Sequence, residues 1–197
     1  MSKSAVEQSE AAALLGEFSA LLRRLGPGAP ALYGADAQAY LEAYQSQVLI
    51  PIELPAIARA AMFAARGQAR EFLLLDAQLA DEPLLQPFAD GSRQMGRLQL
   101  ESLRPLRDER LARRYRAAVA SGEAQGWHTV VFGLILAIYS WPLRQGLLHY
   151  GCETLAGLAA SSGAPAAIDE AVLRAAVDQT LRNLESSDAH ITSIASP

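Results

Sequence analysis

The chain has 197 residues, of which 51% are hydrophobic, and a net charge of −4. A chain of this length can bury its own core as one domain, and its single cysteine, Cys152, excludes an internal disulfide. The polar start MSKSAVEQSE lacks the apolar segment of a signal peptide. We therefore expect one domain over 1–197 in the reducing cytoplasm.

Alanine and leucine dominate the sequence, and aromatic residues make up only 7% of it, which favours helix over strand. We expect an all-α, single-domain bundle of about eight to ten helices. Segment 1–35 should hold an N-terminal helix and a linker, and 186–197 should be a flexible tail. Pro51 and Pro55 should mark a joint between two helices. Apolar periodicity and breaking residues predict helices over 5–25, 36–49, 55–65, 69–80, 83–103, 108–120, 127–140, 142–160 and 168–184.

The stretch GWHTVVFGLILAIYSWPLRQGLLHYG (126–151) contains the longest apolar run. Its apolar part, 129–139, is well short of the roughly 20 residues that a membrane span needs, and Pro142 and Arg144 interrupt any extension. A short helix that is apolar on all sides belongs in the middle of a bundle. We expect this stretch to be a core helix and not a membrane span.

Sixteen of the seventeen basic residues are arginines, and eight of these fall in one segment that ends at Arg116. Only Glu101, Asp108 and Glu109 oppose them, so the segment carries +5 and the rest of the chain −9. This segment is either a solvated helical face or a docking patch for an acidic partner; the third alternative, a nucleic-acid site, has no accompanying binding motif. The eight arginines are Arg93, Arg97, Arg104, Arg107, Arg110, Arg113, Arg114 and Arg116.

Candidate chemistry is sparse. His149 and Cys152 would share a helix face and could ligate a soft metal, but two ligands do not make a site, and a core cysteine beside a partly exposed histidine is the simpler interpretation. The sequence has no GxSxG, GxGxxG or GxxxxGK[ST] motif. The carboxylate pairs 81–82 and 169–170 lie at helix starts, where they favour the helix dipole. We expect no enzymatic activity and no cofactor.

Three stretches resemble the urease accessory protein UreF family. They are LPAIARAAMFAARGQAREFLLLDAQL (54–79), SRQMGRLQL (92–100) and SGEAQGWHTVVFGLILAIYSWPLRQGLLHYGCETLAGL (121–158). The resemblance covers about 36–160, whereas both ends of the chain depart from the family pattern. The residues that match are Ser92, Arg93, Met95, Gly96, Arg97, Gly126, His128, Val131, Phe132, Gly133, Pro142, Leu143 and Tyr150.

The resemblance implies an all-α, often dimeric, non-enzymatic adaptor. Such a protein links UreD (also called UreH) to the GTP-hydrolysing UreG during nickel insertion into the urease apoprotein. We expect Gly96 and Gly133 to permit close helix approach, and His128 to be a structural histidine. Partner-binding candidates are Arg93, Arg97, Arg110, Arg113 and Arg114. A diverged UreF-like binder with another partner, an arginine-rich nucleic-acid-binding regulator, and a small metal-binding protein using His149 and Cys152 are the alternatives.

Overall fold

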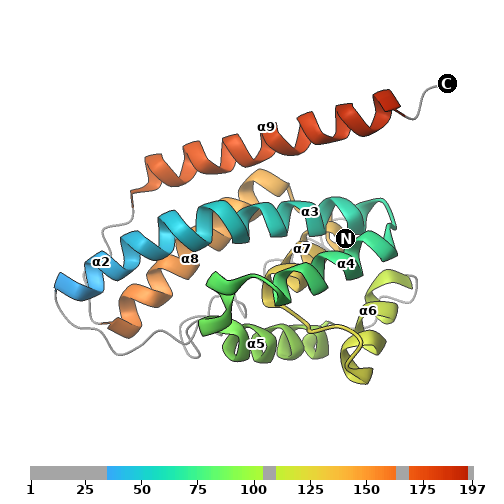
Figure 1. The fold of residues 1–197 in the computed structure, drawn as a ribbon, viewed down its shortest axis with the longest axis horizontal. Coiled ribbons are helices and arrows are strands. Elements are labelled where there is room, and N and C mark those ends of the chain that lie inside the picture. The colour runs from blue at the N-terminus through green and yellow to red at the C-terminus, as the bar shows by residue number, and fades with distance from the viewer. Residues whose placement is uncertain (1–34, 104–109, 163–168, 195–197) are drawn as a thin grey trace, which may run out of the picture.

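The computed structural model describes residues 35–103, 110–162 and 169–194, and these residues form helices with no strand (Figure 1). The helix predicted over 5–25 lies outside the described residues. The elements are α2 (Ala35–Tyr44), the π-helix η1 (Gln45–Glu53), α3 (Leu54–Ala65), α4 (Ala69–Ala80), the 3₁₀-helix η2 (Pro83–Phe88), α5 (Ala89–Ser102), α6 (Arg110–Ser121), α7 (His128–Ile138), α8 (Leu143–Ser162) and α9 (Glu170–Ile194).

Helix α7 occupies the centre of the bundle. It makes its most extensive contact with α3 and also packs against α5 and α4. Residues from His128 through Leu136 are all buried, which confirms that the apolar stretch is a core helix. Gly133 permits the contact with α3, because a Cβ there would lie 2.6 Å from the Cβ of Ala60 and 2.7 Å from the carbonyl oxygen of Ile57.

The expected joint at Pro51 and Pro55 is wrong, because α2, η1 and α3 follow one another as one continuous helical rod (Figure 1). Pro51 lacks an N–H group, and its ring would clash with the carbonyl four residues earlier in an α-helix. The structure meets this conflict with wider π turns, in which the Leu54 N–H donates to the Leu49 carbonyl five residues back. Pro55 stands in the first turn of α3, directly after the π turns.

The same rod is the one described helix that is long and apolar enough to cross a membrane by length and composition alone. The segment Gln38–Ala65 has 28 residues. Its most apolar stretch of 18 residues has a mean hydropathy of 1.6, and 50% of that stretch is buried inside the structure. It contains the buried Glu53 and packs on α7 and α8. These features are those of a helix that lines a protein core.

Two further helix predictions need correction. The helix expected over 83–103 is divided: Glu82 accepts a hydrogen bond from the Leu84 N–H at 3.2 Å and opens η2, and α5 follows only at Ala89. Pro87 inside η2 explains the division, because it cannot supply the hydrogen bond that an α-helix requires there. The last helix, expected to end at Leu184, continues to Ile194.

Helix α9 lies along the outside of the bundle against α8, α3 and η1. Among the side chains of α9 that the structure describes, Leu173 and Val177 are fully buried. Arg144 on α8 forms an exposed ion pair with Asp178, with Nε and Oδ1 2.8 Å apart. Figure 1 shows the C-terminal half of α9 diverging from the rest of the bundle.

Candidate partner-binding surface

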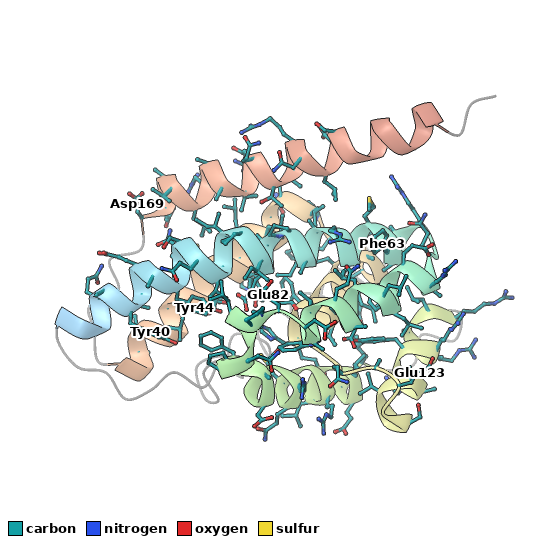
Figure 2. All side chains as sticks on the ribbon, in the orientation of Figure 1. Tyr40, Tyr44, Phe63, Glu82, Glu123 and Asp169 are labelled. Atoms are coloured by element: carbon teal, nitrogen blue, oxygen red, sulfur yellow. The ribbon has the colours of Figure 1, made fainter. Side chains whose placement is uncertain are left out.

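The structure divides the arginine-rich segment into exposed and packed side chains. Arg97, Arg110, Arg113 and Arg114 are exposed, and no acidic residue of the described part of the chain lies within ion-pair distance of them. Arg104 and Arg107 fall outside the described residues. Figure 2 shows nitrogen-tipped side chains extending away from the bundle near α6, with Glu123 labelled just beyond the C-terminal end of that helix.

The pattern of α6 explains why its arginines face outward. Leu111, Tyr115 and Ala118 are buried and share one side of the helix. Arg113 and Arg114 lie three and four residues after Arg110, so the three side chains share one exposed side of the helix. We call these three residues the α6 basic face.

Two other arginines of the segment are packed against the protein itself. The guanidinium of Arg93 lies over the ring of Trp127, 5.2 Å from its centroid, and Arg93 is half-buried. Arg116 donates to the carbonyls of Leu100 and Leu103 at 2.6 and 2.7 Å, and so caps the C-terminal end of α5. Arg93 is thus held by packing on Trp127, and Arg116 by capping α5.

The buried carboxylate of Asp76 holds α6 in place. Asp76, on α4, accepts a hydrogen bond of 2.5 Å from the Tyr115 hydroxyl on α6. It also accepts from the backbone N–H groups of Gln125, Gly126 and Trp127, at 2.5, 3.2 and 3.2 Å. One fully buried carboxylate thus joins α4, α6 and the loop that leads into α7.

The two family-like motifs of α5 and α7 meet in space. The Ser92 hydroxyl lies 2.5 Å from Nδ1 of His128, and Arg93 covers Trp127. A Cβ at Gly96 would lie 2.0 Å from the carbonyl oxygen of Gly126, so only glycine fits there. Gly126 itself has a φ of +78°, which glycine adopts without strain. The close approach expected at Gly96 is confirmed, and its partner is the loop before α7.

His128 belongs to a buried polar cluster that extends to the π-helix. Nε2 of His128 bonds with the Tyr150 hydroxyl on α8, and the Tyr44 hydroxyl donates to Oε2 of Glu53 at 2.8 Å. Tyr150 is in turn hydrogen-bonded to Glu53. The direction of these hydrogen bonds depends on the tautomer of His128: with Glu53 ionised, Tyr150 donates to its carboxylate and Nε2–H to Tyr150, whereas a protonated Glu53 donates to Tyr150, which donates to Nε2.

Burial shifts the pKa values of the two titratable ends of the cluster in opposite directions. Desolvation raises the pKa of Glu53 to about 7, although its hydrogen bonds to Tyr44 and Tyr150 oppose the shift. Desolvation lowers the pKa of His128 to about 3. Both groups are therefore neutral between these values, and the 3.9 Å separation of His128 Nε2 and Glu53 Oε1 is not an ion pair.

Ser92 and His128 have the residue types of a catalytic nucleophile and its base, but they are not accessible to a substrate. Ser92 and His128 are each 2% exposed, so a substrate atom cannot reach the hydroxyl. The hydrogen bonds instead tie α5, α7, α8 and the π-helix together in the core. His128 is thus a hydrogen-bonded structural histidine, in agreement with the expectation for it.

The weak metal candidates are not brought together with further ligands. His149 and Cys152 are both half-buried on α8, and burial raises the pKa of the Cys152 thiol. Among the described residues, no group of three or more His, Cys, Asp or Glu side chains could hold a metal ion.

Sequence reasoning missed the two buried carboxyls, Asp76 and Glu53. Each stands alone inside an apolar run, FLLLDAQL and LIPIELP, respectively. A lone acid in an apolar helical run predicts a buried acceptor with dedicated donors, because a buried carboxyl without them is costly. The donors themselves, such as Tyr115 and the N–H groups of 125–127, come from distant parts of the chain.

Comparison with known proteins agrees with this architecture. The model of the UreF family matches residues 33–162, which include every helix from α2 through α8. No curated protein and no solved structure matches the chain. UreF proteins are helical, non-catalytic accessory proteins. Because the match covers well over half of the 197 residues, the chain belongs to the UreF family.

Proposed function

We propose that this protein is a cytoplasmic adaptor of urease maturation, which links a UreD/UreH-type protein to the GTP-hydrolysing UreG while nickel is inserted into the urease apoprotein. The observation that carries the proposal is the UreF family match over 33–162. Nucleotide chemistry belongs to UreG in this scheme, and this chain contributes a rigid surface. We also propose that it acts as a homodimer.

The structure supports a binding role through its rigidity. The buried cluster from Ser92 to Glu53 and the Asp76 contacts fix α5, α6, α7 and α8 relative to one another. A fixed surface loses little conformational freedom when a partner binds, which favours affinity. A partner interface of ordinary size buries about 800 Å² on each side.

Co-purification tests the proposal. The tagged protein is co-expressed with the UreD-type and UreG-type proteins of the same organism, and the retained partners are measured. Cells that lack their own UreF but contain the other urease genes provide the second measurement, urease activity with added nickel. We expect both capture of the partners and restored activity. Neither capture nor activity, in cells that a known UreF restores, would contradict the proposed function.

A further inference from the structure

We propose that the exposed side of α6 is a docking surface for an acidic protein, and that the α6 basic face contacts carboxylates of that partner. The identity of the partner, a component of the urease-maturation complex, rests on the proposed function. The chemistry rests on the charges, exposure and packing of α6.

The arginines of the α6 basic face have no ion-pair partner on the described surface of this protein. Exposed arginines on α8 and α9 do find one: Arg144 pairs with Asp178, and Arg174 pairs with Glu170 at 2.7 Å. Arg182 donates to the Gln179 amide oxygen at 2.7 Å. Helix α6 contains no acidic residue in RLARRYRAAVAS. The guanidinium groups of the α6 basic face are thus available to external carboxylates, which arginine binds with paired N–H donors.

The arginines of the α6 basic face also repel one another. Arg113 and Arg114 lie three and four residues after Arg110, and like charges at these spacings are neighbours on a helix and destabilise it. Carboxylates of a partner, with the matching spacing of about one helical turn, would relieve this repulsion.

Helix α6 is anchored to the bundle, and small side chains continue its exposed side. Tyr115 is fixed by Asp76 and by an edge-on contact with Phe72, whose ring centroid is 5.0 Å away. Ala117 and Ala120 are exposed and continue the same side of the helix toward its C-terminal end. This side of α6 therefore carries arginines in its first half and small alanine side chains in its second half, where a partner's backbone can approach closely.

The charge distribution favours a protein over a nucleic acid. A nucleic acid is an extended polyanion, and its binding requires many phosphate contacts. The chain outside the arginine-rich segment carries −9, and acidic Glu101 and Glu123 are exposed near the ends of α5 and α6. A short row of three arginines bordered by acidic surface is complementary in charge and extent to a local acidic patch on a folded partner.

The experiment compares matched variants in the co-purification described above. The double variant Arg110→Glu/Arg113→Glu reverses the face. Its control, Arg59→Glu/Arg70→Glu, changes the net charge equally at exposed positions of α3 and α4. Arg110→Lys/Arg113→Lys keeps the charge, and Ala117→Trp adds bulk without charge. The rate of partner association is measured at about 50 mM and about 300 mM salt, to vary the screening of charge.

We expect the reversed variant to associate roughly tenfold more slowly than wild type at low salt, with a smaller difference at high salt. The control and lysine variants should remain near wild type, and Ala117→Trp should weaken capture at both salt concentrations. Equal capture by wild type and the reversed variant overturns the docking surface alone. Failure of wild type to capture either partner overturns the proposed function and the inference that rests on it. A gel shift with duplex DNA that the reversal abolishes would assign the face to nucleic acid and also overturn the inference.

Discussion

Asp76 and Tyr115 are 39 positions apart in the sequence, and their side chains share a buried hydrogen bond of 2.5 Å between α4 and α6. The same carboxylate accepts three backbone N–H groups of the loop before α7. A buried acceptor with four donors is difficult to replace, because its loss leaves each donor without a partner.

Replacement of Asp76 tests this anchor. We expect Asp76→Ala to lower the free energy of unfolding by about 3–5 kcal/mol, because buried polar groups lose their partner and a cavity is left. Tyr115→Phe removes only one donor and should cost about 1–2 kcal/mol. Urea denaturation of both variants measures the difference. If Asp76→Ala costs no more than Tyr115→Phe, the backbone contacts do not contribute as argued.

Substitution of Gly96 tests the contact between α5 and the loop before α7. A Cβ at Gly96 would be 2.0 Å from a backbone oxygen, so we expect Gly96→Ala to lower the free energy of unfolding by about 2 kcal/mol or more. Gly67→Ala is the matched control, since Gly67 has open space around it but a φ of +66°. The control should cost only about 1 kcal/mol for backbone strain. Thermal denaturation that ranks the control as the more harmful would refute the proposed clash.

The pH dependence of stability tests the buried cluster. The pKa of Glu53 is raised from 4.5 to about 7, so its contribution is fully present below pH 4.5 and is lost as pH rises toward 7. The pKa of His128 is lowered from 6.5 to about 3, so its contribution is present above pH 6.5 and is lost as pH falls toward 3. Between pH 4.5 and 6.5 the two slopes oppose each other, and these two groups leave stability nearly constant there.

Glu53→Gln removes the pH dependence of stability that Glu53 contributes and leaves that of His128. The variant should become more stable by roughly 2 kcal/mol relative to wild type as pH rises from 4.5 to 6.5, since of the two groups only His128 then contributes a slope. Urea midpoints of wild type and variant at the two ends of this range provide the measurement. Parallel pH profiles for the two proteins would show that Glu53 does not titrate as its burial predicts.

Substitutions of Arg93 and Arg97 distinguish an arginine that packs on an aromatic ring from one that contributes only surface charge. Arg93→Ala should lower the free energy of unfolding by about 0.5–1 kcal/mol, because the cation over the Trp127 ring is lost. It should also shift the tryptophan fluorescence to the red, as the ring gains contact with water. Arg97→Ala, at an exposed position on the same helix, should change stability by less than about 0.5 kcal/mol. The same red shift in both variants would argue against the stacking contact.

Several local features of the fold could be predicted because short-range signals agree there. The helix predicted over 69–80 matches α4, and Gly67 ends α3 in the left-handed region, as its position after a helix suggests. Other features could not, because remote contacts decide them. Pro51 by itself predicts a break in the helix, yet the rod continues through π turns. The Tyr44–Glu53 hydrogen bond joins the two ends of the π segment.

The sequence by itself determined the helical class, the central place of the apolar stretch, the family resemblance and the excess of arginine between Arg93 and Arg116. These follow from composition, periodicity and short motifs, which act over one or two helical turns. Only the tertiary structure decided which arginines are exposed, which are packed on Trp127 or on the end of α5, and where Asp76 and Glu53 find their donors. The physical reason is that burial and hydrogen bonding depend on groups tens of residues away, which local pattern does not specify.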